Sequence, residues 1–482
     1  MDRLTETKTI LTMDVTTLAK RIKNREIRSV DAVLIYINHL ATINKKVYCV
    51  VAERFADALE EAKQCDEMLD QGEGVGRLFG VPISVKESFD VQGMKTTGGF
   101  KHRANYTATV DAEVVQRLKA EGAIILCKTN TSTADLTFES INKQYGRTNN
   151  PWNLSRTAGG SSGGEAALIA CGGAAVGIGS DLAGSLRLPG HFNGVLAFKS
   201  GAGDVSMSGH FPKPIHPLQD TMFGIGALGK SVQDLKLIYS TLSNRRPAET
   251  DIHDFRLIMP MLPSTYPLSN DTENGWQMVQ EFFNGKVHME NGEMPDFIAK
   301  LPLLHLEVLT IGGAKDLYPA FFAKKSFPLA KTMLREAILH DTSYYYYFLK
   351  TMMLAKAGSN VFRTKRGHAD KLKTKQDQFI AAGNRLLDKA VMVLPVYPTP
   401  AKKHGQLDRE LFSNRFSYLK LMPYTVLPNA LGYPALSVPI AMSEQGLPIS
   451  VQLVSKQGNE NALFYFGRQL EQSFLGYHQA RP

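Results

Sequence analysis

Hydrophobic and polar positions divide the chain into parts with different periodicities. In the first 75 residues, apolar side chains recur three and four positions apart, which is the spacing of amphipathic helices. This pattern predicts helices over Val15–Asn24, Ser29–Asn44 and Ala52–Gln71. Ser29 is expected to cap the second helix, and the glycines of Gly72-Glu73-Gly74 are expected to end the third.

The pattern changes near residue 76, where short apolar runs begin to alternate with helical segments. The expected strands are Gly80–Val85, Ala123–Cys127, Val391–Val396, Ala435–Ile440 and Ile449–Leu453. The helices expected among them are Asp111–Gly122 and Asn461–Glu471. Strands that alternate with helices predict an α/β protein with a sheet at its centre.

The middle of the chain, about 245–390, is rich in aromatic residues and helical patterning, and it contains the run Tyr344–Phe348 (YYYYF). These tyrosines either line a hydrophobic substrate tunnel or belong to a helix packed on the core with its hydroxyls in water. No repeat or long linker divides the chain, so we expect a single domain over 1–482. Its parts are an N-terminal helical segment (1–75), a catalytic core (76–240), a variable helical layer (245–390) and C-terminal strands with a helix (391–482).

Composition and charge narrow the class of protein. Hydrophobic residues make up 43% and charged residues 21%, which is typical of a soluble globular protein. The N-terminus lacks the apolar stretch of a signal peptide. The uncharged run Ala166–Ser180 is too short to cross a bilayer, and Leu421–Ser443 contains prolines that would interrupt a helix. We therefore expect a soluble protein without a membrane-spanning segment.

Charged residues and cysteines give no sign of nucleic acid, metal or disulfides. The net charge is +9, but lysines and arginines are scattered rather than gathered in a basic block, so we expect no nucleic-acid partner. The four cysteines have neither zinc-site nor disulfide spacing, which indicates a reducing, cytoplasmic location. No metal and no cofactor is expected.

The stretch 158–164 (AGGSSGG) is the first candidate for chemistry. A phosphate-binding loop is disfavoured because Glu165 stands where that loop needs lysine. The GxSxG pattern also fits an esterase elbow, but that turn follows an apolar strand and needs a histidine partner. Here a polar loop with a proline, 149–157, precedes it, and His191, the nearest candidate base, is expected to be structural.

A second segment of small residues, 177–189, changes this interpretation. Small residues allow backbone amides to face a ligand, as in an oxyanion hole. The segment carries its own serine, Ser185, and Lys86 follows the strand GVPISV upstream. Two serines and a lysine can form a proton relay without histidine.

Taken together, these segments resemble the amidase signature family. The residues that carry the resemblance are Lys86 in GVPISVKESFD, Tyr145–Pro151, Gly159–Glu165, Gly177–Pro189, Leu427–Pro439 and Gly446–Leu453. They cover most of the chain, and the middle part matches least. Within the family the chain is most similar to the general amidases and the fatty-acid-amide-hydrolase-like branch. The resemblance implies a large, mixed, twisted β-sheet with helices on both faces.

The resemblance also implies a Ser–cis-Ser–Lys triad. By motif position, the nucleophile is Ser185, the bridging serine with a cis peptide bond is Ser161, and the base is Lys86. Ser162 is implied as a supporting hydroxyl. Asp181 and Arg187 are interpreted as a buried ion pair that fixes the loop. The implied oxyanion hole consists of the backbone N–H groups of Leu182, Ala183, Gly184 and Ser185.

Several positions depart from the family pattern. Ser200, Gly201 and Asp204 replace a common proline, threonine and arginine, and Lys230 replaces a common arginine. Asp135 lies on a segment implied to line the acyl pocket. It either faces the pocket, which would disfavour a long apolar chain, or points to solvent.

The expected function is hydrolysis of carboxylic acid amides to an acid and an amine or ammonia, through an acyl-enzyme. One alternative is a glutamine amidotransferase A-type subunit that supplies ammonia to a tRNA-dependent partner enzyme. The other is a catalytically silent binding protein on the same scaffold. The partner expected is a small-molecule amide, and a homodimer is an oligomeric state that the sequence leaves open.

Overall fold

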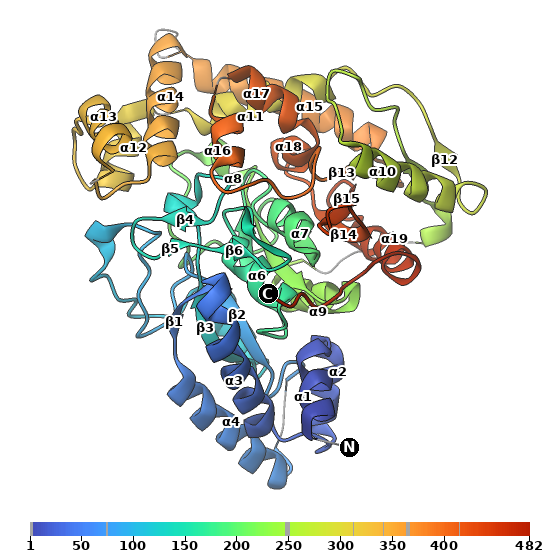
Figure 1. Ribbon diagram of the computed structural model, residues 1–482. Coiled ribbons are helices and arrows are strands. Elements are labelled where there is room, and N and C mark those ends of the chain that lie inside the picture. Colours follow the sequence, from blue (N-terminus) through green and yellow to red (C-terminus); the bar gives the residue numbers. More distant parts are fainter. Residues whose placement is uncertain are drawn as a thin grey trace.

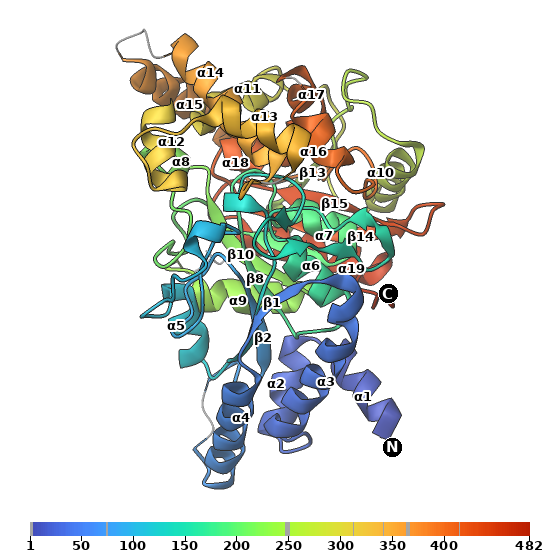
Figure 2. The ribbon, with the colours of Figure 1, turned by 60° about the vertical axis from the view of Figure 1, so that its left-hand side comes forward.

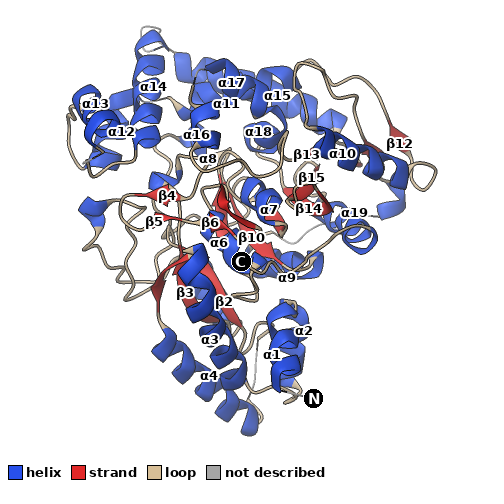
Figure 3. Cartoon of the chain, in the orientation of Figure 1, coloured by secondary structure: helices blue, strands red, loops and turns tan. Residues whose placement is uncertain are grey.

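A computed structural model describes most of the chain, and it has the expected fold class. The described residues are 3–73, 76–245, 251–311, 313–340, 342–362, 367–413 and 415–482. Some of the expectations concern residues outside these ranges. They are the boundary between residues 75 and 76, the glycine at position 74, and the first residues of the middle segment, 246–250. A large mixed sheet runs through the molecule, with helices on both of its faces (Figure 1, Figure 3).

The sheet has eleven strands, drawn from both ends of the chain. In spatial order they are β1 (Val50–Glu53), β3 (Ile124–Thr129), β2 (Pro82–Lys86), β8 (Gly177–Asp181), β10 (Gly224–Gly229), β9 (Leu196–Lys199), β14 (Ala435–Met442), β15 (Pro448–Val454), β13 (Ala390–Pro395), β11 (Arg256–Ile258) and β12 (Met289–Glu290). β2 pairs in parallel with both β3 and β8. Three neighbouring strands therefore end at the same edge of the sheet.

The N-terminal helices lie at one end of the molecule in both ribbon views (Figure 1, Figure 2). They are α1 (Arg3–Thr12), α2 (Val15–Lys23), α3 (Ser29–Val47) and α4 (Phe55–Asp70). Two expectations here were wrong in detail. Ser29 is the first residue of α3 rather than its cap, and its N–H donates to Asp66 of α4 at 2.7 Å. Ala52 lies in β1, whose pairing with β3 overrides the helical pattern.

Two pairs of helices pack closely on the central strands. One pair is α6 (Gly163–Ala170) with α7 (Arg187–Asn193), and the other is α9 (Val232–Leu242) with α19 (Glu460–Ser473). Every residue of α6 is buried, and apart from Glu165 all of them are small or apolar. α5 (Glu113–Ala120) leads into β3, as the sequence predicts.

A further group of helices lies at the end opposite α1–α4 (Figure 2). It contains α8 (Pro217–Asp220), α11 (Leu301–Leu309), α12 (Gly313–Phe322), α13 (Leu329–Leu339), α14 (Tyr346–Phe362), α15 (His368–Leu386), α16 (Gln406–Leu411), α17 (Arg415–Leu421) and α18 (Pro423–Ala430). α10 (Asn270–Phe283) packs on β14 and β15. Among the described residues, we found no helix with the length and apolar character that a membrane crossing requires.

Two small hairpins complete the fold near the glycine–serine stretch. They are β4 (Ile141–Asn142) with β5 (Gly146–Arg147), and β6 (Asn149–Asn150) with β7 (Asn153–Thr157). The segment expected as a polar loop before the glycines is therefore the second hairpin. Its strand β7 is polar and mostly exposed, so it differs from the apolar strand of an esterase elbow.

Candidate active site

Three of the predicted site residues lie at or after the ends of three parallel strands. Lys86 is the last residue of β2, Asp181 is the last of β8, and the segment after β3 leads to Asp135. Because β2 pairs in parallel with β3 and β8, these ends meet at one edge of the sheet. The crevice outside the carboxyl ends of strands is where open α/β sheets bind their ligands.

Lys86 is fully buried, and three acceptors surround its amine. Nζ lies 2.6 Å from Ser161 Oγ, 3.1 Å from Ser180 Oγ and 3.0 Å from Asp135 Oδ2. Burial lowers the pKa of Lys86 because it disfavours the charged amine, whereas the Asp135 carboxylate opposes this lowering. The lysine in turn lowers the pKa of Asp135.

Ser161 is held in place through its backbone. The Gly160–Ser161 peptide bond is cis. The Ser161 carbonyl accepts a hydrogen bond from the hydroxyl of Ser140 at 2.9 Å. Ser140 Oγ also accepts from the N–H of Gly163, at the start of α6. The hydroxyl of Ser161 is thereby fixed against Lys86.

Ser185 lies in the turn between β8 and α7, and it lines the same cavity as Ser161. The Ser185 carbonyl accepts from the N–H of Ser162 at 3.1 Å. Gly184 has φ of +100°, a conformation that glycine adopts without steric cost. The cavity lining from this turn consists of Leu182, Ala183 and Ser185.

The structure disagrees with one member of the implied oxyanion hole. The N–H of Gly184 donates to Asp181 Oδ1 at 2.7 Å. It is therefore committed to a carboxylate and is not available to a substrate oxygen. The N–H groups of Leu182, Ala183 and Ser185 remain as candidates.

Asp181 and Arg187 form a buried ion pair at the base of this turn. Arg187 Nε lies 3.1 Å from Asp181 Oδ2, and both side chains are inaccessible to solvent. The guanidinium lowers the pKa of Asp181, against the opposing effect of burial. The remaining acceptors of the guanidinium are Thr425 O, Gln452 Oε1 and Asn429 Oδ1. Arg187 thus ties the turn to α18 and β15.

Ser162 and His191 have contacts with the backbone. The Ser162 hydroxyl donates to the Ser180 carbonyl at 3.3 Å. His191 Nε2 donates to the Thr399 carbonyl at 3.1 Å, and its Nδ1 accepts from the Ser450 N–H at 2.9 Å. Both ring nitrogens of His191 are occupied, so this histidine is structural, as the sequence analysis expected.

Asp135 points into the catalytic cluster rather than to solvent. Its Oδ2 accepts from Ser88 Oγ at 2.8 Å and faces Lys86, and its Oδ1 accepts from the Thr131 hydroxyl. The carboxylate is only 10% exposed. Asp135 therefore interacts with the proposed base and also lines the cavity, as the pocket-facing alternative expected, but its charge is paired with Lys86.

Sequence reasoning missed two residues that complete the cluster. Ser180 lies in the segment of small residues 177–189, but nothing in that motif marks it as functional. His210 Nε2 lies 2.9 Å from Ser180 Oγ and 3.5 Å from Asp135 Oδ2. No motif surrounds His210 in the sequence. The residue lies in the irregular segment after β9, which folds back to the site.

A third missed residue, His305 of α11, supports the turn that carries Ser185. Its Nε2 donates to the Leu182 carbonyl at 2.8 Å, and its Nδ1 accepts from the Tyr418 hydroxyl at 2.9 Å. Burial lowers the pKa of His305 to about 4. The histidine is consequently neutral near pH 7, and it holds the Leu182 peptide from the side of the helical layer.

The cavity above these residues has a volume of about 420 Å³. Its floor carries the hydroxyls of Ser161, Ser180 and Ser185. Its walls are mostly apolar and come from the β3–β4 segment and the helical layer; they include Phe138, Leu306, Phe321, Met352 and Leu411. A small polar group at the floor and apolar walls are typical of a site for a small apolar ligand.

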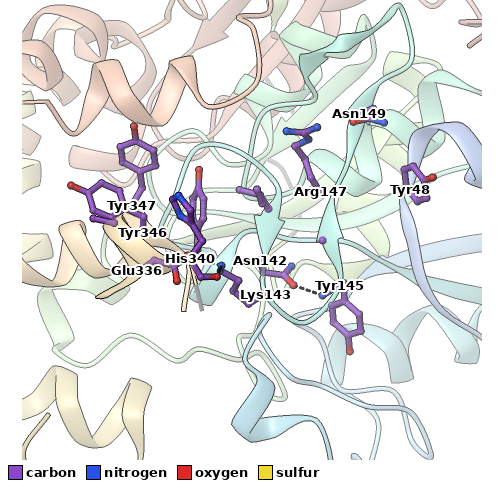
Figure 4. Close-up of a pocket in the computed structure, with 14 residues that line it drawn as sticks. Tyr48, Asn142, Lys143, Tyr145, Arg147, Asn149, Glu336, His340, Tyr346 and Tyr347 are labelled. Atoms are coloured by element: carbon purple, nitrogen blue, oxygen red, sulfur yellow. Dashed lines mark hydrogen bonds and ion pairs between the residues drawn. The ribbon is translucent and has the colours of Figure 1, made fainter. Parts of the chain in front are cut away.

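The tyrosine run has no part in this cavity. Phe348 is fully buried against Phe100, and the residues of α14 that line the cavity are Thr351, Met352, Leu354 and Ala355. Tyr345, Tyr346 and Tyr347 line a separate hollow of about 1030 Å³ on the surface. Figure 4 shows Tyr346 and Tyr347 at one side of this hollow, with Arg147 and Asn149 toward the other. The run therefore does not line a tunnel to the catalytic cluster, and the packed-helix interpretation holds in part: Tyr346 and Tyr347 belong to α14, whereas Tyr344 and Tyr345 precede it.

Two of the departures from the family pattern, Asp204 and Lys230, have structural partners away from the cluster. Asp204 is buried and pairs with Arg245 at 3.2 Å. Lys230 Nζ donates to the carbonyls of Leu11 at 2.7 Å and Met13 at 3.1 Å. Lys230 thus fastens the end of α1 to the sheet.

Known proteins match most of the chain in sequence. The sequence model of the Amidase family matches residues 31–271 and 339–464. Fatty-acid amide hydrolase 2-B of Danio rerio is 30% identical over 98% of this chain and 91% of its own length. The A-type subunit of the Glutamyl-tRNA(Gln) amidotransferase of Picosynechococcus sp. is 28% identical over 97% of this chain and 99% of its own.

Solved structures share the fold. A 6-aminohexanoate cyclic dimer hydrolase superposes with a TM-score of 0.80 and 21% identity, over 98% of this chain and 99% of its own. The peptide amidase of Stenotrophomonas maltophilia gives a TM-score of 0.76 and 20% identity, over 97% and 98%. At these identities the likeness extends to the architecture of the sheet and its helices.

Proposed function

The chain belongs to the amidase signature family of amide-hydrolysing enzymes, and we propose that it hydrolyses apolar carboxamides through Ser185, Ser161 and Lys86. One observation carries the proposal: Lys86 Nζ lies 2.6 Å from Ser161 Oγ at the floor of an apolar cavity that Ser185 also lines. A hydroxyl nucleophile needs a base within reach, and in the proposed reaction the Ser161 hydroxyl passes the proton from Ser185 to Lys86.

The first half of the reaction is attack by Ser185 on the amide carbonyl. As the Ser185 Oγ–carbon bond forms, the Ser185 proton passes to Ser161 Oγ, and the Ser161 proton passes to Lys86 Nζ. Collapse of the tetrahedral intermediate breaks the carbon–nitrogen bond. The same two groups return a proton to the leaving amine. Water then attacks the acyl-enzyme by the same route and releases the acid.

The turn after β8 supplies the oxyanion site. The negative charge that develops on the carbonyl oxygen is stabilised by the N–H groups of Leu182, Ala183 and Ser185, which line the cavity. A donor of this kind is worth about 3 kcal/mol to the transition state. Gly184 has a different role, because its N–H holds the turn against Asp181.

The cavity walls support an apolar acyl or amine group in the substrate. Apolar surface that leaves water on binding contributes about 25 cal/mol per Å². The fatty-acid amide hydrolases among the relatives support the same substrate class. The amidotransferase subunits among the relatives raise glutamine as a second substrate. Glu307 and Lys213 are the charged wall residues that could pair with its α-ammonium and α-carboxylate, but most of the lining is apolar.

A fluorophosphonate probe tests the proposal without knowledge of the substrate. We expect the wild-type protein to be labelled, with the adduct on Ser185 when the peptides are analysed by mass spectrometry. Ser185→Ala and Lys86→Met are expected to lose labelling by at least about 100-fold, since each removes a member of one relay. Ser155→Ala, on an exposed hairpin, is the matched control and is expected to be labelled normally.

An adduct on Ser161, or a wild-type protein that is not labelled, would contradict the proposed roles. A panel of amides then addresses the substrate. Hydrolysis of amides with an apolar acyl or amine group should exceed that of glutamine. Glutaminase activity that emerges only with an added partner enzyme would instead favour the amidotransferase function.

A further inference from the structure

A second hydrogen-bonded chain starts from Lys86 and contains neither Ser161 nor Ser185. Ser180 Oγ lies 3.1 Å from Lys86 Nζ and 2.9 Å from His210 Nε2. One hydroxyl thus connects two bases, and the proposed reaction gives Ser161 the same task between Lys86 and Ser185. The reaction proposed above leaves Ser180 and His210 without a task.

The orientation of the chain follows from the other nitrogen of His210. Nδ1 lies 2.9 Å from the Pro212 carbonyl, which accepts hydrogen bonds but cannot donate them. Nδ1 therefore carries a proton, and Nε2 of the neutral ring is an acceptor. The Ser180 hydroxyl donates to Nε2, and its oxygen accepts from Lys86.

Asp135 faces both bases with the same oxygen. Its Oδ2 lies 3.0 Å from Lys86 Nζ and 3.5 Å from His210 Nε2. A carboxylate in this position stabilises a positive charge on either base. A protonated Lys86, held by Asp135, has no lone pair with which to accept the proton of Ser161. The proposed reaction therefore needs a way to remove one proton from the lysine.

We propose that His210 is a positioning residue that takes the surplus proton of Lys86 through Ser180 and so prepares the lysine to act as a base. A proton moves from Lys86 Nζ to Ser180 Oγ while the original Ser180 proton moves to His210 Nε2. The Lys86 N–H bond and the original Ser180 O–H bond break, and a new Ser180 O–H bond and a His210 N–H bond form. The net charge of the cluster is unchanged, and Asp135 becomes the counter-ion of His210. This inference rests on the proposed function.

Two other carboxyl groups near Lys86 and His210 do not act as a free negative charge. Asp181 of β8 is paired with Arg187. Burial raises the pKa of Glu165 of α6 to about 8, so this side chain is mostly uncharged at pH 7. Around His210, the rings of Phe89 and Phe223 lie with centroids at 4.9 and 5.1 Å.

Two charged side chains of the cavity wall complete these surroundings. Lys213 lines the cavity, as does Glu307, which pairs with Lys375 at 3.6 Å. Within the described ranges, no ion pair joins Lys213 or Glu307 to the cluster. Asp135 is consequently the anion that both bases share.

The pH dependence of labelling by the fluorophosphonate tests this inference. In His210→Gln the amide still accepts from Ser180 but cannot take the proton, so Lys86 stays paired with Asp135. The labelling rate rises with pH, and we expect the midpoint of this rise to move up by at least about one pH unit. At pH values below the midpoint, this shift makes labelling about tenfold slower than in the wild type. Ser180→Ala, which removes the bridge and keeps both bases, should move it in the same direction. His253→Gln, at an exposed histidine, is the matched control.

The same measurement in an Asp135→Asn protein, with and without His210→Gln, separates the two explanations. Without the carboxylate, burial alone deprotonates Lys86, so the midpoint should move down. His210→Gln should then add little to Asp135→Asn. A merely structural role for His210 predicts instead an equal fractional loss at every pH in both backgrounds, and that result would overturn the inference.

A measurement on the wild-type protein does not depend on whether the variants fold. Nitrogen-15 NMR should show both ring nitrogens of His210 protonated at the pH of fastest labelling. A neutral His210 at that pH would refute the shared proton. Absence of wild-type labelling would refute the proposed function itself, which is a separate outcome.

Discussion

At the scale of single residues, Asp181 determines the shape of the turn that carries the nucleophile. Its two oxygens accept from the N–H groups of Gly184 at 2.7 Å and Leu186 at 3.1 Å and also face Arg187. A carboxylate can satisfy this many donors because each oxygen accepts more than one hydrogen bond. Side-chain contacts, with Asp181 at their centre, therefore hold the turn instead of a regular hydrogen-bond ladder.

Removal of Arg187 tests how much this residue contributes. Arg187→Met leaves Asp181 as an unpaired buried charge and leaves three acceptors without a donor. We expect a loss of about 3–5 kcal/mol in the free energy of unfolding, measured by urea denaturation. Lys373→Ala, which removes an exposed ion pair with Asp377, is the control and should change stability little. Equal losses in the two variants would contradict a structural role for the buried pair.

The residues that sequence reasoning identified at this scale are those within short motifs. Lys86, Ser161 and Ser185 each lie in a recognisable local pattern, and the structure brings Lys86 and Ser161 into contact. His210 and Asp135 meet only because β2, β3 and β8 end together and the segment after β9 folds back. Such proximity depends on the register of the sheet, which no local pattern encodes.

At the scale of elements, helix α11 supports the catalytic turn from the helical layer. His305 is fully buried in the middle of α11 and donates to the Leu182 carbonyl, whose peptide neighbours the proposed oxyanion site. A segment that the sequence marks only as variable and helical thereby contacts the site. Its helices could be predicted from their periodicity, but their position against the turn could not.

Substitution of His305 separates this support from general stability. His305→Leu removes the donor to Leu182, so the turn should lose its fixed position. We expect the rate of fluorophosphonate labelling to fall about tenfold or more, because small displacements of catalytic groups are costly. His288→Leu, at an exposed histidine, is the control. A variant with lower thermal stability but an unchanged labelling rate would show that α11 does not position the turn.

Element boundaries show the same limit of sequence reasoning. The strands predicted at 80–85 and 123–127 agree with β2 and β3 to within two residues. The helix expected from Ala52 instead begins at Phe55, because residues 50–53 pair with β3 at the edge of the sheet. Tertiary hydrogen bonding therefore decided the state of a segment whose local pattern fits either structure.

At the scale of the whole molecule, buried histidines connect folding to pH. His191 links α7 to β15 by accepting from the Ser450 N–H, and it donates to the Thr399 carbonyl. Burial lowers the pKa of His191 from 6.5 to about 4. The unfolded chain therefore binds a proton between pH 6.5 and 4 at a position where the folded protein does not.

The sign of the effect on stability follows from this difference. Where the unfolded state binds more protons, stability rises with pH, so the contribution of His191 is present above pH 6.5 and is lost as the pH falls toward 4. The difference between a pKa of 6.5 in the unfolded chain and about 4 in the folded protein corresponds to about 3 kcal/mol in the free energy of unfolding. His191→Gln keeps one donor and one acceptor but does not titrate. We expect its unfolding midpoint to fall less than that of the wild type between pH 7 and 5, with His253→Gln behaving like the wild type. Parallel pH profiles for all three proteins would mean that His191 is protonated without cost in the folded state.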